Sequence, residues 1–480
     1  MTKSPAELNA DARVALAATP SRAYPEALDE SGADETVAAL RRLAGLLGWS
    51  GGGGGAFSSV IPEGARVLVK PNFVTHENQG PWGMLPLVTH QSLVRAAAEE
   101  ALRSGASEVT VGDAPIQGCD FGELLRRTGL DVWAAELQRR EPRFKGVVDF
   151  RRTVSTFKGG VRAAEEGVRP LERFVLFDLA GESLLEPITD EKESFRVTCY
   201  DPRLLARTHA RGRHRYLVAR EAVEADVIIN LPKLKTHKKA GLTCALKNLI
   251  GINGNKEFLP HHRVGGAATG GDCYAGGGVL KGALERLADL QNTSRARGAA
   301  RLWNGLAQAV EGAIKLSGEG LDVEGSWSGN DTIWRTCLDL NRVLLYGRAD
   351  GTLGEEVERR VLHVTDAVVA GQGDGPLAPR PLPMGLLFGG SNAAAVDWVG
   401  ALLLGYDPAR IPIAREALGR FRWPLAPFGR HDIEVVGDVD AGVADDVLAD
   451  LTLGAETVYP AGWLDAVARR QLPPKDPPRP

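Results

Sequence analysis

The chain is 480 residues long, which is more than one hydrophobic core usually serves, so we expect two lobes. Hydrophobic residues make up 44% of the chain and charged residues 25%, an ordinary balance for a globular protein that excludes wholesale disorder. The net charge of −4 argues against a dedicated nucleic-acid-binding protein, which would be basic overall.

The first third of the chain predicts a parallel α/β unit. Apolar residues recur at helical spacing in two segments, and two short apolar runs are typical of buried strands. The expected elements are a helix at 35–47, a strand at 67–69, a helix between Thr89 and Gly105, and a strand at 108–111. Strand, helix and strand in this order form a right-handed βαβ unit. Ligands of such units bind at the carboxyl ends of the strands, so Lys70, Asn72 and Asp113 are expected beside a ligand.

The later part of the chain repeats this pattern. The expected elements are strands at 174–177, 226–230 and 360–369, a turn at 371–376, and helices at 242–249, 279–290, 302–316, 332–345 and 392–404. We therefore expect an α/β fold of two lobes, built on mainly parallel sheets with Rossmann-like βαβ units, and a ligand cleft between the lobes. The expected division is an N-terminal lobe at 20–150, a connecting segment at 151–212, a C-terminal lobe at 213–465 and a disordered proline-rich tail at 466–480.

The cysteine spacing and the lengths of the apolar runs indicate in which cellular compartment the protein is expected. No two cysteines share a C-x-x-C spacing, so neither a disulfide framework nor an iron–sulfur cluster is expected. The N-terminal segment lacks the apolar core of a secretion signal, and the longest apolar runs fall far short of the roughly 20 residues that span a bilayer. We expect a cytoplasmic protein with no membrane partner. The cysteines are Cys119, Cys199, Cys244, Cys273 and Cys337.

The segment from Arg203 to Arg263 is strongly basic. It holds thirteen lysines or arginines against four acidic residues, in a chain that is slightly acidic overall. A solvated basic face would explain many such runs, but here the charges alternate with Pro, Gly, Thr and His after a predicted strand. We interpret the segment as a site for a small carboxylate or phosphate. The candidate substrate-binding residues are Lys70, Asn72, Lys233, Lys235, Asn248 and Arg263.

His237 and Lys247 are the candidate catalytic residues. They stand on either side of Gly241, where a loop enters the predicted helix, so both side chains can face one cavity. A neutral imidazole is the usual general base near neutral pH, and a desolvated lysine has a lowered pKa and becomes nucleophilic. The alternatives are a capping or surface histidine, and a lysine whose ammonium group extends to water.

Two pairs of residues are candidate metal ligands. His261 and His262 are adjacent, and a strand would direct them to opposite sides. Asp366 and Asp374 stand near a predicted strand end, where carboxylates suit Mg²⁺, although turn chemistry explains Asp374 equally well. The cofactor is therefore left open, with a divalent metal as one possibility.

Several motifs together resemble a known family. They are VLVKPN, GDAP, INLPKLKTH, G-x-T-x-A-L-K-N-x-I-G and DAVVAGQGDGP, within 65–410. On these motifs the chain is identified as a member of the domain of unknown function family numbered 362, whose activity is largely unassigned. Many members of that family carry an added iron–sulfur segment, and this chain has no such cysteine cluster.

One segment is also similar, more distantly, to nickel-pincer lactate racemase-like enzymes. The shared pattern is H-x-x-x-G-x-T-x-x-x-K, at His237, Gly241, Thr243 and Lys247. In that group the segment holds a catalytic histidine and a cofactor-bearing lysine, and a histidine further downstream ligates the metal. The resemblance implies His261 or His262 for that last role. The acidic motif and the second histidine that the racemases carry after their first two strands are absent here.

These observations predict an enzyme that acts on a small anionic substrate by proton or hydride transfer, of isomerase, racemase or oxidoreductase type. One alternative is phosphoryl or glycosyl-phosphate chemistry at the basic strand end. The other is a non-enzymatic module that binds an anion or nucleic acid. Nucleic acid is disfavoured, because Phe258 is the one aromatic residue between Asn230 and Arg263 that could stack on a base. The oligomeric state is left open.

Overall fold

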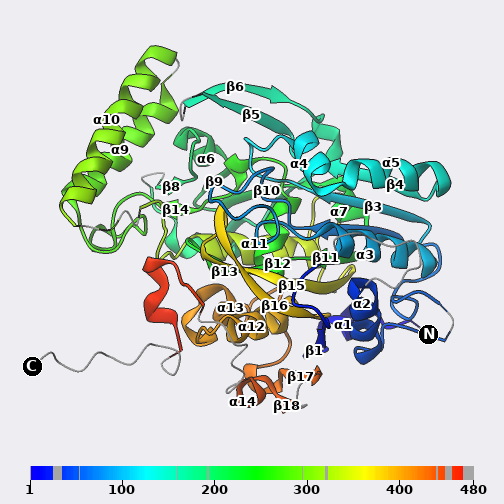
Figure 1. Cartoon of the computed structure of the whole chain (residues 1–480). Helices are drawn as coiled ribbons and strands as arrows, with labels where there is room; N and C mark the ends of the chain where they lie inside the picture. Colours follow the sequence, from blue (N-terminus) through cyan, green and yellow to red (C-terminus); the bar gives the residue numbers. More distant parts are fainter. Residues whose placement is uncertain are drawn as a thin grey trace, which may run out of the picture.

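The computed structural model describes residues 2–24, 35–52, 54–158, 161–191, 194–294, 296–318, 320, 323–438, 442–448 and 457–468. Within these ranges the centre of the molecule is an 11-stranded mixed sheet (Figure 1). Its order is β18 (Gly442–Val443), β17 (Glu434–Gly437), β1 (Arg13–Ala18), β16 (Ala378–Gly390), β15 (Arg360–Asp374), β11 (Val227–Leu231), β2 (Arg66–Pro71), β3 (Glu108–Asp113) and β4 (Phe144–Asp149). The hairpin of β12 (Lys233–His237) and β13 (Gly241–Thr243) attaches to β15.

The middle of the sheet is parallel and buried on both faces. Strand β11 is parallel to β2 on one side and to β15 on the other. Its side chains alternate between the two largest hydrophobic clusters of the described residues, with Val227 and Ile229 in one and Ile228 in the other. This burial explains why the strand is a continuous apolar run in the sequence.

Helices cover both faces of the sheet and make three layers. One face packs against α2 (Glu35–Leu46), α3 (Gln91–Arg103), α4 (Phe121–Thr128) and α5 (Leu130–Arg140). The other packs against α7 (Arg220–Glu224), α8 (Ala245–Asn248), α11 (Ile333–Tyr346), α12 (Ala393–Leu403) and α13 (Pro412–Glu416). Helix α3 begins where the sequence predicts it, because the His90 side chain accepts a hydrogen bond from the Ser92 N–H and caps the helix.

Smaller elements surround this core. Strands β7 (Phe174–Asp178), β10 (Arg213–Ala219) and β9 (His209–Ala210) form one sheet, β8 (Phe195–Arg196) pairs with β14 (His262–Arg263), and β5 (Thr153–Lys158) pairs with β6 (Val161–Gly167). The remaining helices are α1 (Pro5–Asn9), α6 (Pro202–Thr208), α9 (Val279–Thr293), α10 (Arg297–Leu316) and α14 (Ala444–Val447). Helices α9 and α10 form a hairpin at the edge of the molecule (Figure 1).

The expected α/β class with a mainly parallel sheet is confirmed, but the strands expected in two lobes share one sheet. Asn230 of β11 lies in register with Lys70 of β2, so the predicted N-terminal and C-terminal lobes meet through backbone hydrogen bonds. The sequence alone did not indicate this single sheet, because an apolar run shows that a strand is buried and not which strand lies beside it. The domain boundaries at 20–150, 151–212 and 213–465 stay predictions. From residue 469 on, the tail predicted to be disordered lies outside the described residues.

The helix predicted at 242–249 is largely a different structure. Residues Gly241–Thr243 form β13, which pairs with β12, and α8 covers only Ala245–Asn248 before a 3₁₀ turn at Leu249–Ile252. The spacing of the apolar residues is compatible with a helix, but residues Gly241–Thr243 pair with β12 as a strand instead. The turn predicted at 371–376 is also shorter, because β15 continues to Asp374.

Replacing Gly241 by alanine is expected to lower the free energy of unfolding by about 2 kcal/mol. Gly241 has φ +82, and a Cβ there would come within 2.8 Å of the Trp463 ring and 3.0 Å of the Ile411 side chain. The matched control is Gly305→Ala in α10, where a Cβ would meet nothing within 4 Å and alanine favours the helix. Urea unfolding midpoints check this. Equal midpoints for the two variants would contradict it.

Candidate functional site

A cavity of about 610 Å³ opens at the carboxyl ends of β2 and β3. Its wall comes from the loops that follow these strands, from residues 197–200, and from the segment between His237 and His261. This is the edge of the sheet at which the sequence predicts a ligand, and both predicted lobes contribute to it. Apolar side chains line it too, including Phe73, Ile116 and Ile250.

Lys247 and Lys256 bring positive charge to the cavity wall. Lys247 comes from α8 and Lys256 from the 3₁₀ turn at Lys256–Phe258. Within the described residues, neither ammonium group makes a hydrogen bond or an ion pair shorter than 4.0 Å. Burial lowers the pKa of Lys247, and burial together with the neighbouring charge of Lys247 lowers the pKa of Lys256 to about 8. Two half-buried cations that make no ion pair among the described residues favour the binding of an anion between them.

His237 stands at the end of β12 with one ring nitrogen already used. Its Nδ1 accepts hydrogen bonds from the backbone N–H groups of Lys239, at 3.0 Å, and Ala240, at 3.2 Å. Burial, and then the charge of Lys247, lowers the pKa of His237 well below its usual value, so the ring is neutral. A neutral imidazole that accepts at Nδ1 carries its proton on Nε2. His237 therefore offers the cavity a hydrogen-bond donor, which differs from the expected role as general base.

His261 has the opposite arrangement. Its Nδ1 lies 2.6 Å from the carbonyl oxygen of Leu259, which only accepts, so Nδ1 carries the proton. Burial and the nearby charge of Lys239 lower the pKa of His261 well below its usual value. The lone pair of Nε2 is then available, and a backbone carbonyl that orients a histidine in this way is typical of a catalytic base or a metal ligand. Of His237 and His261, the two histidines of the segment between β12 and β14, His261 has the geometry of a base.

A chain of buried amides fixes the floor of the cavity. Lys235 donates a hydrogen bond to Oδ1 of Asn72 at 2.7 Å, and Nδ2 of Asn72 donates to Oδ1 of Asn248 at 2.9 Å. Asn248 in turn donates to Oδ1 of Asn230 at 2.8 Å. Asn72 and Asn248 line the cavity, whereas Lys235 lies behind them and holds them in place.

A buried ion pair joins the ends of β2 and β3. Lys70 Nζ lies 2.7 Å from Oδ1 of Asp113, and the Lys70 side chain is 0% exposed. Lys70 also donates to the Asn248 carbonyl at 3.1 Å, and the Phe73 N–H donates to Oδ2 of Asp113 at 2.6 Å. The pair therefore connects two strand ends to α8. Asp113 reaches the cavity wall and Lys70 does not.

Several residues predicted to bind substrate or metal lie elsewhere. Lys233 and Asp366 form a fully buried pair at 2.7 Å, away from the cavity. Arg263 lies 3.8 Å from Asp272 and His262 faces a different cluster, and neither lines the cavity. Lys70, Lys233 and Lys235 are thus placed as internal supports, because each finds a carboxylate or carbonyl partner inside the fold.

Asp366 and Asp374 do not form the metal site that the sequence suggests. Both lie on β15, eight residues apart, which is about 26 Å along an extended strand. Asp374 is exposed and pairs with Lys238 at 3.4 Å. One ion cannot bridge such a separation, so a shared site is excluded.

The sequence reasoning missed some of the cavity wall. Lys256 belongs to the basic run between Arg203 and Arg263, and its charge was the signal that could have singled it out. Residues 197–200, including Cys199 and Tyr200, come from the segment expected to be a connection and carry no motif. Lys239 also reaches the cavity, where it pairs with Glu324 at 3.4 Å.

Two known proteins and one protein family resemble this chain. The "Thylakoid-associated protein sll1697" of Synechocystis sp. is 23% identical over 434 residues, which cover 89% of this chain and 88% of that protein. A crystal structure of a protein from Thermotoga maritima matches with a TM-score of 0.29 and 13% identity. That match covers 79% of this chain and 60% of the other, so this chain spans less than two thirds of that protein.

Among the described residues, every helix is too short or too polar to cross a membrane. The family model described as "Domain of unknown function (DUF362)" matches residues 67–156 and 187–402, which is more than half of the chain and includes both strand ends and the His237–His261 wall. The chain therefore belongs to the DUF362 family of domains of unknown function.

Proposed function

We propose that the protein is an enzyme that binds a small carboxylate or phosphate in this cavity and transfers a proton on it, as an isomerase or racemase does. One observation carries the proposal. Lys247 and Lys256, which make no ion pair among the described residues, line the same cavity as His237 and His261, two neutral histidines whose ring nitrogens have opposite roles. Proton transfer is favoured over hydride transfer because these groups are proton donors and acceptors.

Each side chain has a role in this scheme. Lys247 and Lys256 bind the anionic group of the substrate. Nε2 of His261 removes a proton from the carbon beside that group, and the Nε2–H of His237 donates a hydrogen bond to the oxygen on which negative charge develops. The apolar part of the wall, with Phe73 and Ile116, accommodates a substrate that also carries a hydrocarbon portion.

Solvent-exchange NMR tests the proposal. The protein is incubated in D₂O with a panel of 2-hydroxy acids and phosphorylated hydroxy acids, and the loss of each proton signal at the carbon beside the anionic group is followed. We expect at least one compound to exchange. His261→Asn keeps an N–H for the Leu259 carbonyl and removes Nε2, so it should bind that compound and not exchange it. Binding without any exchange in the wild type would instead indicate an anion-binding module.

The affinity for a carboxylate ligand is expected to fall as the pH rises from 7 to 9. The pKa of Lys256 is lowered to about 8, so its ammonium form is present below that pH and is lost above it, whereas the charge of a carboxylate stays constant. One unit above the pKa the affinity falls by about tenfold. Calorimetric titration measures it. The arginine in Lys256→Arg stays charged, so the affinity of this variant should not fall near pH 8. If its affinity falls with pH as in the wild type, Lys256 is not the group whose titration weakens binding.

We also propose a cytoplasmic location. The five cysteines are all free thiols, as expected in a reducing compartment. The thylakoid association belongs to the name of the Synechocystis relative. Fractionation of the native host cells, with detection of the protein in the soluble and membrane fractions, tests this location.

A further inference from the structure

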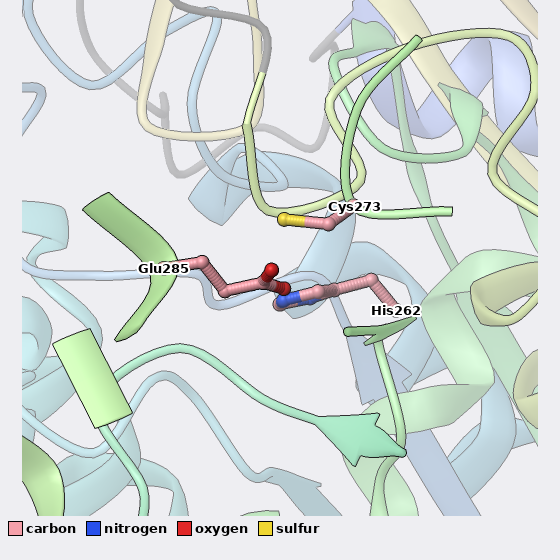
Figure 2. Close-up of side chains that lie close together, drawn as sticks. All are labelled: His262, Cys273 and Glu285. Atoms are coloured by element: carbon pink, nitrogen blue, oxygen red, sulfur yellow. The ribbon is translucent and has the colours of Figure 1, made fainter. Parts of the chain in front are cut away.

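The two adjacent histidines at the start of β14 face different surroundings. His261 lines the cavity, and His262, the first residue of β14, faces away from it toward Cys273 and Glu285. One ligand atom from each of these three residues lies within 4.8 Å of the other two. Figure 2 shows the three side chains converging from β14, from the loop that follows it and from α9.

The three side chains are buried or half-buried, and one ring nitrogen of His262 has no hydrogen-bond partner among the described residues. His262 is 4% exposed, and its Nδ1 has no hydrogen-bond partner among the described residues. Burial lowers the pKa of His262 well below its usual value, so the ring is neutral and able to ligate a metal. Burial raises the pKa of Cys273 and of Glu285, and the negative charge of Glu285 raises that of Cys273 further. A buried imidazole with an unpartnered ring nitrogen, a buried thiol and a half-buried carboxyl therefore meet at one point, and all three are ligand types for a metal ion.

We propose that His262, Cys273 and Glu285 bind a divalent cation of the zinc type. Imidazole nitrogen, thiolate sulfur and carboxylate oxygen are the ligand atoms that zinc prefers, and three protein ligands leave the fourth tetrahedral position for water. The thiolate and the carboxylate together balance the charge of the ion, so the buried site is neutral. On binding, the thiol proton passes to solvent and the Cys273 sulfur forms the bond to the metal.

Neighbouring groups support the ligands and do not compete with them. The Gly265 N–H donates to both oxygens of Glu285, at 3.1 and 2.9 Å, and the Glu324 N–H donates to Sγ of Cys273 at 3.2 Å. Such second-layer hydrogen bonds orient metal ligands. The nearby cation Arg196 is already paired with Asp289, at 3.0 Å.

The location of the site suggests what the ion does. It joins β14, the loop after it and helix α9, which belongs to the α9–α10 hairpin, directly behind the cavity wall formed by His261. The ion would thus fix the backbone that carries His261. This inference stands on the cluster alone and does not depend on the proposed reaction in the cavity.

Metal titration of the full chain tests the inference. After treatment with a chelator, the protein is titrated with Co²⁺ and Zn²⁺, and metal content, the thiolate-to-cobalt charge-transfer absorption and the melting temperature are measured. We expect one ion per chain, the charge-transfer band, and a rise in melting temperature with Zn²⁺. Cys273→Ser should lose the band and the rise, whereas Cys199→Ser should keep both.

Two further variants separate this cluster from the cavity. His261→Asn removes a cavity histidine and should still bind the ion, while Glu285→Gln, on a half-buried helix position, should bind it more weakly even if Cys273→Ser fails to fold. A wild-type protein that binds no Zn²⁺, or Zn²⁺ binding that survives both Cys273→Ser and Glu285→Gln, would overturn the inference. A loss of binding only in His261→Asn would place the metal in the cavity and also overturn it.

Discussion

Asp113→Ala is expected to lower the free energy of unfolding by about 3–5 kcal/mol, because it leaves the ammonium group of Lys70 buried without its partner. The Lys70 side chain is 0% exposed and lies 2.7 Å from Oδ1 of Asp113. The same change also removes the acceptor of the Phe73 N–H, at 2.6 Å. Equilibrium unfolding in urea, monitored by tryptophan fluorescence and circular dichroism, measures the loss.

A surface pair supplies the matched control. Asp374 and Lys238 lie 3.4 Å apart, with side chains 58% and 44% exposed, so Asp374→Ala should cost at most about 1 kcal/mol. The double variant Lys70→Met with Asp113→Ala should be more stable than Asp113→Ala alone, since no buried charge remains. If Asp113→Ala costs no more than Asp374→Ala, the pair does not support the fold.

The local elements could be predicted because their signals are local. Strand β11 is a run of apolar residues that are buried on both faces, and helix α3 starts at His90, which caps it. The single sheet could not be predicted in this way. The pairing of β11 with β2 joins residues far apart in the chain, and neither strand carries a side-chain pattern that specifies its neighbour.

The candidate site was likewise only partly predictable from the sequence. The sequence places Asn72, His237, Lys247 and Asn248 at one ligand site, and all four line the cavity. It could not separate the lysines that face a ligand from those that face a carboxylate inside the fold. Lys233 follows an apolar strand just as a ligand-binding lysine would, yet Asp366, from a distant segment, neutralises it.

The sequence also could not predict the separate roles of His237 and His261. Which ring nitrogen carries the proton depends on the backbone that surrounds Nδ1. Two N–H groups surround it in His237, and one carbonyl group does so in His261. These contacts arise from loop conformations that no residue pattern specifies, so the motif alone does not show which of the two histidines can act as a base.

Lys247→Met is expected to weaken anion binding by about 10–100-fold, because it removes a charged hydrogen-bond donor from the cavity. Without ligand, the same variant should be more stable than the wild type by about 1 kcal/mol, since methionine fills similar space and has no charge to desolvate. The reason is that the described residues offer the Lys247 ammonium group no hydrogen bond or ion pair, while burial lowers its pKa. Ligand titration and urea unfolding on the same samples measure both effects.

Lys235→Met is the matched control for this trade between binding and stability. The Lys235 ammonium group donates to Oδ1 of Asn72 and to the Leu87 carbonyl, so its loss should destabilise the protein and leave those acceptors unpaired. Lys247→Arg then separates the charge of the side chain from proton transfer, because a guanidinium group stays protonated. This variant should bind the anion more tightly than Lys247→Met. A loss of proton exchange on the substrate by roughly 10²–10⁴-fold would assign Lys247 a part in the proton transfer. If Lys247→Met destabilises the protein as much as Lys235→Met does, Lys247 is a structural lysine and the cavity loses its main anion-binding group.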